Sequence, residues 1–180
     1  TNLEASLGHA ERSVFPLKKV ISGCMQGYQM TYPDQIFNLD IEDKNILCDG
    51  VPEYIAQLMD KLISNAIEFS LPNSPITVSL QQHNKQAIIK VTNWGASLPQ
   101  DMSEQIFESM VSIRPQASSN KPHLGLGLYI ARLITDFHNG SIKAKNVSYF
   151  TEDKDNQTDG ESSAQHGVEL CLTLPVIETS

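Results

Sequence analysis

The segment from Pro52 to Phe69 constrains the fold most, because it carries the clearest amphipathic helix pattern in the chain. Pro52 suits the first turn of a helix, where a missing backbone N–H removes no intrahelical bond. A regular apolar stripe along the rest of the segment predicts a helix that packs one side against a core. The stripe consists of Ile55, Leu58, Met59, Leu62, Ile63, Ala66 and Ile67.

Alternating apolar and polar residues predict strands on both sides of this helix. ITVSL (76–80) and AIIKVTN (87–93) form a hairpin pattern across the polar turn QHNKQ (82–86). QIFNLDI (35–41) predicts another strand, with apolar residues of its alternating pattern at Ile36, Leu39 and Ile41. Further strands are expected at 45–48, 141–147 and 168–175, and further helices at 17–30, 101–110 and 127–137.

These elements predict an α/β (α+β) fold, a two-layer sandwich in which a mixed sheet carries helices on one face. We expect one domain over 17–176, because 180 residues supply one core but not two. Residues 1–16 are expected to be a linker or the tail of a preceding helix, since Pro16 interrupts any helix that enters from upstream. Residues 151–165 lack large apolar side chains and are predicted to be disordered.

Composition excludes several classes of function. A net charge of −8 argues against nucleic-acid and anionic-membrane binding, although a single phosphate can still be held by the backbone of a helix start. Three widely spaced cysteines without a CxxC pair favour reducing, cytoplasmic surroundings. No segment approaches the ~20 apolar residues of a membrane span, so we expect a soluble piece of a longer protein.

One polar group lies on the 52–69 helix. Lys61, Asn65 and Glu68 are spaced i, i+4 and i+7, so they project together beside the apolar stripe. An amide has poor helix propensity, and the carbonyl oxygen of Asn65 is a hard ligand that suits Mg²⁺. The alternative is an ordinary solvated helix face.

A second group is HLGLGLYIARLI (123–134), in which glycines and leucines alternate at a helix start. Gly125 and Gly127 allow close approach of a ligand, and the free N–H groups of the helix start attract phosphate. Leu126 and Leu128 are expected to anchor this turn in the core. The pattern matches neither the dinucleotide fingerprint nor the Walker A motif, and glycine can also serve only to permit a tight entry into the helix.

A third group is VTNWGASLP (91–99), a strand end followed by a turn. Gly95 frees the backbone, and Asn93 faces out of the sheet, where its oxygen can accept a hydrogen bond from an adenine amine. The alternative is a simple turn asparagine.

The order of these groups resembles the ATP-binding domain shared by histidine kinases, gyrase-type topoisomerases, Hsp90 chaperones and MutL proteins, over about residues 17–175. DKLISNAIEFS (60–70) resembles the N box, VTNWGASLP the first glycine box, IFESM (106–110) the F box and HLGLGL the second glycine box. The resemblance implies a Bergerat-type fold. Lys61 stands where the other branches place a water-activating glutamate, which favours the histidine kinases. The residues in the N box and the F box are similar to those of sensor kinases of proteobacterial dedicated sortase systems.

The resemblance implies ATP and Mg²⁺ as cofactors, and transfer of the γ-phosphoryl of ATP to a histidine on a dimerisation domain outside this chain. It also implies a response regulator as partner, a homodimeric parent and an inner-membrane location for that parent. Residues 111–124 would form a lid over the nucleotide. The implied roles are Mg²⁺ ligand for Asn65, adenine contact for Asn93 and base pocket for Gly95. Gly125 and Gly127, with Leu126 and Leu128, would border the phosphates. Lys61, Arg114 and Lys121 would be cationic contacts, and the alternative for Arg114 and Lys121 is that they are ordinary solvated loop charges.

Several residues depart from the family pattern. Asn93 replaces the usual aspartate, Ser97 a glycine, Glu68 a basic residue, His123 a glycine and Met110 an aromatic residue. His9 lacks the setting of a phosphoacceptor. Asn93, Ser97 and Glu68 support one alternative, a degenerate domain that binds nucleotide weakly or not at all and acts through protein contacts. A further alternative is a self-sufficient ATPase, against which Lys61 argues.

Overall fold

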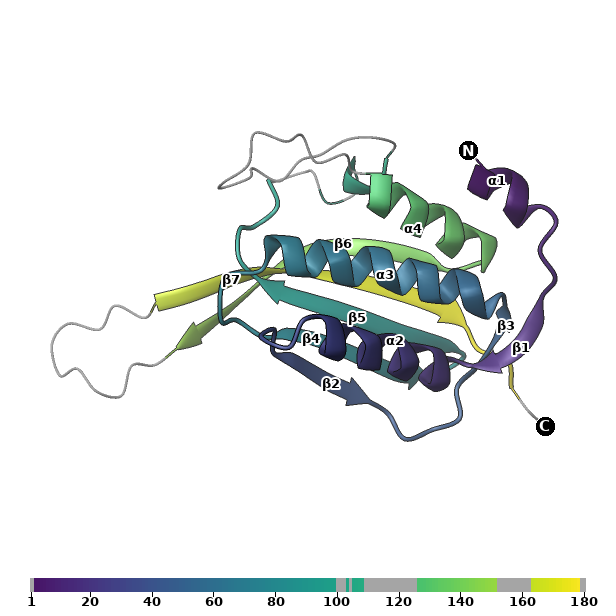
Figure 1. Ribbon diagram of the computed structural model, residues 1–180, viewed down its shortest axis with the longest axis horizontal. Helices are drawn as coiled ribbons and strands as arrows, with labels where there is room; N and C mark the ends of the chain where they lie inside the picture. The colour runs from purple at the N-terminus through teal and green to yellow at the C-terminus, as the bar shows by residue number, and fades with distance from the viewer. Residues whose placement is uncertain (1, 100–102, 104, 109–125, 152–162, 179–180) are drawn as a thin grey trace, which may run out of the picture.

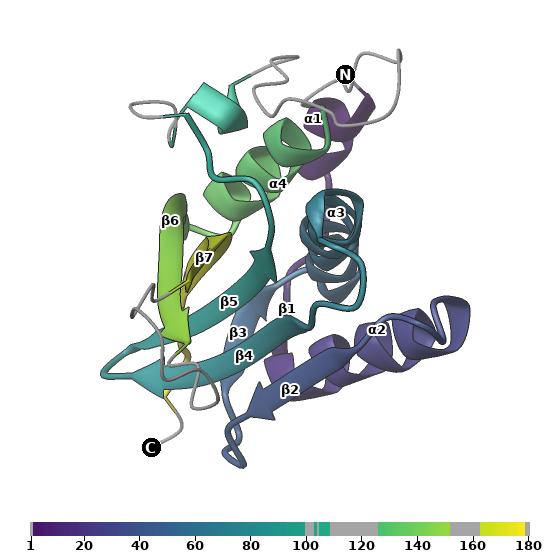
Figure 2. The ribbon, with the colours of Figure 1, turned by 90° about the vertical axis from the view of Figure 1, so that its left-hand side faces the viewer.

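The chain folds into two layers, a five-stranded sheet and a set of helices on one of its faces (Figures 1 and 2). The computed structural model describes residues 2–99, 103, 105–108, 126–151 and 163–178. The elements are α1 (Asn2–Leu7), β1 (Ser13–Pro16), α2 (Leu17–Thr31), β2 (Phe37–Ile41), β3 (Leu47–Gly50), α3 (Pro52–Phe69), β4 (Ile76–His83), β5 (Gln86–Trp94), the 3₁₀ turn η1 (Gln105–Phe107), α4 (Leu126–Phe137), β6 (Ser141–Thr151) and β7 (Ser163–Pro175).

The main sheet is mixed, as expected, with strand order β2-β4-β5-β7-β6. β2 runs parallel to β4, and the other neighbours are antiparallel. The predicted β4–β5 hairpin turns at Asn84, whose φ of 55° is left-handed and is tolerated by asparagine. The three interior strands, β4, β5 and β7, each present one face to the helices.

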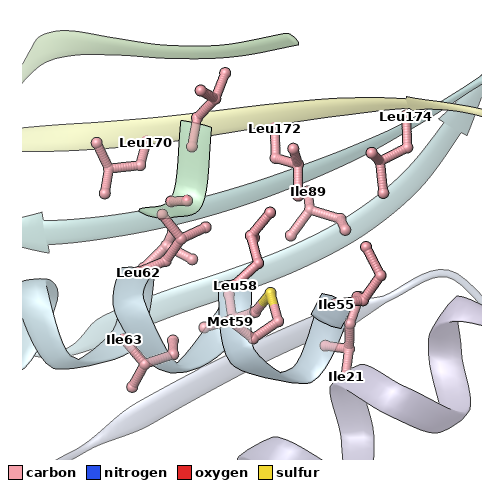
Figure 3. Packing of buried hydrophobic residues seen from close by; sticks show 14 of the residues in the cluster. Ile21, Ile55, Leu58, Met59, Leu62, Ile63, Ile89, Leu170, Leu172 and Leu174 are labelled. Atoms are coloured by element: carbon pink, nitrogen blue, oxygen red, sulfur yellow. The ribbon is translucent and has the colours of Figure 1, made fainter. Parts of the chain in front are cut away.

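α3 occupies the centre of the helical layer and begins and ends where its sequence pattern predicts. In Figure 3 its side chains lie between the sheet, represented by Ile89 and Leu172, and Ile21 of α2. Six residues of the predicted stripe are buried, and Ile67 packs against the same cluster. Each fully buried aliphatic side chain stabilises the fold by about 1.5–3 kcal/mol, which makes this helix the main contributor to the core.

Two predictions about the N-terminal third were wrong. Residues 13–16 form a strand, β1, and it pairs with β3 in a separate two-stranded sheet, so β3 does not join the main sheet. Ile36, just before β2, and Leu39 within it are 51% and 41% exposed, whereas Ile41 packs against the core as predicted, together with Phe37. β2 is an edge strand, where an apolar residue can stay in solvent, and alternation alone therefore misassigned Ile36 and Leu39.

The predicted α4 and the later strands are present with shifted ends. α4 stops at Asn139-Gly140 as predicted, with Asn139 left-handed and the Gly140 N–H bonded to the Thr135 carbonyl. β6 and β7 are longer than predicted, and their ladder reaches the pair Thr151 and Ser163, so the predicted disordered segment is too wide at both ends. The rest of that segment and the predicted lid (111–124) lie outside the described residues, as does most of the predicted 101–110 helix, of which η1 is the described helical part.

The N-terminal end of α3 is closed by polar contacts. The buried His138 ring accepts the Val51 N–H at Nε2 and bonds the Ile134 carbonyl through Nδ1. Arg12 donates to the Phe137 carbonyl and lies over the Phe137 ring, 4.2 Å from its centroid. None of the helices in the described ranges is long and apolar enough to cross a membrane.

Candidate functional site

The polar edge of α3 lies beside the first turn of α4. Lys61 and Asn65 are half-buried, at the border of the core as their spacing predicts, and Glu68 is exposed. Gly127 faces the Lys61 side chain, and a Cβ added to Gly127 would lie 3.6 Å from Lys61 Cδ. The fold therefore brings together residues from two of the predicted groups, which are more than sixty positions apart in the chain.

Asp60, next to this edge, contacts both Tyr28 and Lys61. The Tyr28 hydroxyl donates to Asp60 Oδ1, and Lys61 Nζ lies 3.9 Å from Asp60 Oδ2. Burial of the phenol, followed by its hydrogen bond to Asp60, raises the pKa of Tyr28. The carboxylate is thereby held toward α2, on one side of the Lys61 ammonium.

The turn after β5 is bonded to the end of α3. The backbone carbonyl of Trp94 accepts the Leu71 N–H at 2.9 Å, and the Gly95 N–H donates to the backbone carbonyl of His166 at 2.8 Å. A Cβ at Gly95 would overlap the carbonyl oxygen of Phe69, so only glycine fits here without a shift of backbone. The close approach fixes the end of β5 beneath the last turn of α3.

Asn93 lies at this end of β5, on the face that is turned toward the helices. It follows Ile89 and Val91 in the buried alternation of the strand and is only 2% exposed. The interpretation as a simple turn residue is therefore wrong. Its Nδ2 is the one buried side-chain nitrogen or oxygen of the described residues that has no hydrogen-bond partner. Native folds pair nearly all such atoms, so an orphaned donor indicates a place for a ligand.

Asn146, which the sequence analysis missed, differs from Asn93 because both polar atoms of its side chain are hydrogen-bonded. Its Oδ1 accepts the Leu98 N–H at 2.7 Å, and its Nδ2 donates to the Leu98 carbonyl at 2.9 Å. This pair clamps the chain that leaves the glycine turn onto β6. Asparagine is depleted in strands, so an amide inside 141–147 was the available signal.

The remaining predicted residues divide into described and undescribed ones. Leu128 is buried, as expected of an anchor, and Ser97 is exposed. Leu126 begins α4, but its side chain is outside the described residues. Arg114, Lys121 and Gly125 also lie outside them, together with Met110 and His123.

A family model described as "Histidine kinase-, DNA gyrase B-, and HSP90-like ATPase" matches residues 50–178, which include α3, Asn93, Gly95 and α4. The sensor kinase ArlS of Staphylococcus aureus, a signal transduction histidine-protein kinase, is 30% identical over 76% of this chain. The chain spans 30% of the length of that relative.

Solved structures share the fold. A mycobacterial sensor histidine kinase, MprB, superposes with a TM-score of 0.71 at 18% identity, over 94% of this chain and 100% of that one. Histidine kinase ThkA, solved in complex with the response regulator TrrA, superposes with a TM-score of 0.68 at 19% identity, over 97% of this chain and 46% of that one. The chain therefore belongs to the histidine kinase-, DNA gyrase B- and HSP90-like ATPases, as an ATP-binding domain of the histidine-kinase type.

Proposed function

We propose that this chain binds Mg·ATP and transfers its γ-phosphoryl to a histidine on a dimerisation domain of the same parent protein. The observation that carries the proposal is the orphaned Asn93 amide, buried at the end of β5 next to Gly95. A buried polar atom without a partner costs about 1–3 kcal/mol, and a bound purine would supply the missing hydrogen bond. Family membership supports a nucleotide as the ligand.

The phosphates would extend from this base site toward the first turn of α4. Gly127 leaves room between α4 and Lys61, and the N–H groups of a helix start favour anions. Gly125, Arg114 and Lys121 are proposed as further phosphate contacts. Lys61, 30% exposed at the side chain, would supply positive charge from α3.

Asn65 is the proposed Mg²⁺ ligand. Its amide oxygen is a hard donor, it is half-buried, and it lies one turn beyond Lys61 on the same edge of α3. Mg²⁺ usually takes one or two protein oxygens and completes its shell with phosphate oxygens and water, so a single amide fits this metal. The bound ion would neutralise charge on the transferring phosphoryl group.

Transfer to another group is favoured over hydrolysis by the residue four positions before Asn65. A hydrolase needs a base for the attacking water, and Lys61 is a cation. Its neighbour Asp60 is bonded to Tyr28 on the α2 side of the helix. The nucleophile would therefore come from a second domain, and catalysis would consist of positioning and charge neutralisation.

The partners follow from the same proposal. ThkA is solved with a response regulator, and we propose that a response regulator also receives the phosphoryl group from the parent of this chain. We further propose that this parent is a homodimeric protein of the bacterial inner membrane, with the ATP-binding domain in the cytoplasm.

The test is calorimetric titration of the chain with ADP and a non-hydrolysable ATP analogue, with and without Mg²⁺. We expect saturable binding tighter than about 1 mM that Mg²⁺ strengthens. Asn65→Ala should remove the strengthening by Mg²⁺ and leave thermal unfolding unchanged. Gln57→Ala, which removes an exposed amide two turns earlier on α3, is the matched control and should bind as the wild type.

Two results would contradict this function. A folded wild-type chain that binds neither nucleotide would favour the degenerate, protein-contact alternative. Steady ATP hydrolysis by the isolated chain, abolished in Asn65→Ala, would favour the self-sufficient ATPase.

A further inference from the structure

Asn93 and Asn146 are both side-chain amides near the end of β5, but only Asn93 has an unpaired amide nitrogen. Asn146 bonds both amide atoms to the Leu98 backbone. Asn93 is more deeply buried, at 2% exposure, and its Nδ2 has no partner in the described ranges. The fold can thus satisfy an asparagine where it only holds the chain together, and it leaves a donor open at the end of β5.

The inward-facing neighbours of Asn93 along the chain offer this donor no partner. Gly95 follows two positions later, pressed against Phe69, and has no side chain. The preceding inward residue, Val91, has no polar group.

The chemistry of an amide differs from that of the carboxylate that the resembling family carries at this position. A carboxylate only accepts hydrogen bonds, so it pairs with the 6-amino group of adenine and repels a 6-oxo group. An amide has an accepting oxygen and a donating nitrogen of nearly the same shape. Rotation of the Asn93 amide by half a turn exchanges the two atoms, and the open Nδ2 suits a carbonyl acceptor.

We propose that Asn93 lets this site bind 6-oxo purine nucleotides as well as adenine nucleotides, so that Asn93 sets the base selectivity of the chain. The inference rests on the proposed nucleotide function and adds a substrate class to it. Oδ1 accepts from the 6-amino group of adenine, and Nδ2 donates to the 6-oxo group of hypoxanthine or guanine. A 6-oxo group pairs the orphaned Nδ2 directly, whereas adenine pairs it only through the acceptor N1 beside its 6-amino group.

The test is calorimetric titration of the chain with ADP and with inosine diphosphate in the presence of Mg²⁺. The inosine base carries an oxo group at position 6 and has no amino group at position 2. For the wild type we expect dissociation constants within about threefold of each other, because each base makes one hydrogen bond to the same amide. This comparison needs no variant.

Asn93→Asp converts the side chain to an acceptor-only group of the same size. It should bind ADP at least as tightly as the wild type, and inosine diphosphate at least about tenfold more weakly, because a charged acceptor then meets the 6-oxo group. Asn84→Asp makes the same change of charge in the exposed turn at the other end of β5 and should keep the wild-type ratio.

The outcomes separate the inference from the function on which it rests. If the wild type binds ADP and binds inosine diphosphate tenfold or more weakly, the nucleotide function stands and the inference is overturned. An unchanged ratio in a folded Asn93→Asp variant also overturns it. If the wild type binds neither nucleotide, the proposed function fails and the inference fails with it.

Discussion

The two ends of the α3–α4 pair differ in whether their buried polar side chains are fully hydrogen-bonded. At the end where α3 begins, His138 uses both ring nitrogens, one for the Val51 N–H and one for the Ile134 carbonyl. Arg12 adds bonds to the carbonyl oxygens of Asp49 and Phe137. This end joins α3, α4 and the β1–β3 sheet, and its polar groups serve the fold.

At the other end, backbone segments approach closely, and one buried side-chain donor has no partner among the described residues. Gly95 lies against Phe69, Gly127 lies beside Lys61, and Asn93 has a donor with no partner among the described residues. This difference supports the proposal that the closed end carries stability and the open end holds the nucleotide. Substitutions at the two ends should therefore separate stability from binding.

The largest expected effect is at the closed end, in His138→Ala. The variant leaves a cavity, removes the partner of the Val51 N–H and removes the side-chain bond to the Ile134 carbonyl, so the free energy of unfolding should fall by about 2–4 kcal/mol. Urea unfolding followed by circular dichroism measures it. His83→Ala, at the exposed end of β4, should change stability by less than about 0.5 kcal/mol. A loss below about 1 kcal/mol in His138→Ala would mean that the closed end does not carry stability.

Sequence patterns predicted the parts of the molecule that repeat with a period, such as the α3 stripe and the β4–β5 hairpin. Asn93 and Gly127 were singled out by local patterns at a strand end and a helix start, and the order of the boxes supplied their proposed roles. His138 was missed because its role depends on Val51, 87 positions away, and a single histidine before a turn gives no local signal. β1 was missed because Ser13–Pro16 is too short to show alternation.

The next largest effect concerns two glycines of the open end. Gly95→Ala should lower the free energy of unfolding by about 1–3 kcal/mol, because its Cβ would overlap the Phe69 carbonyl oxygen. Gly127→Ala should leave stability unchanged or raise it by up to about 1 kcal/mol, because its Cβ has room at 3.6 Å from Lys61 and alanine favours a helix. Thermal unfolding distinguishes them. Equal destabilisation would contradict the described packing.

Gly127→Ala then becomes a probe of binding that is separate from the fold. Any weakening of nucleotide affinity in this variant reports on the space between α4 and Lys61, because the helix itself is not destabilised. Gly95→Ala cannot make that distinction, since its clash moves the end of β5.

A smaller effect should follow from pH at the closed end. Burial lowers the pKa of His138 below its usual 6.5, since the neutral ring accepts the Val51 N–H. A lowered folded-state pKa means that this stability is fully present above the unfolded pKa and is lost as the pH falls from about 6.5 toward the folded-state value. The melting temperature should fall between pH 7.5 and pH 5.5, and it should fall less in His138→Gln, whose amide does not titrate. An equal fall in both proteins would remove His138 as the cause.

The smallest expected change in stability is at Asn93, and it sharpens the comparison most. Asn93→Ala removes a buried donor that is unpaired within the described part of the chain, so the free energy of unfolding should stay within about 0.5 kcal/mol of the wild type. Asn146→Ala removes the same side chain but loses both bonds to Leu98, and should lower it by about 1–2 kcal/mol. Urea unfolding of both variants compares them. If Asn93→Ala destabilised the protein as much as Asn146→Ala, the Asn93 amide would stabilise the fold, and its burial would no longer support a ligand site at the open end.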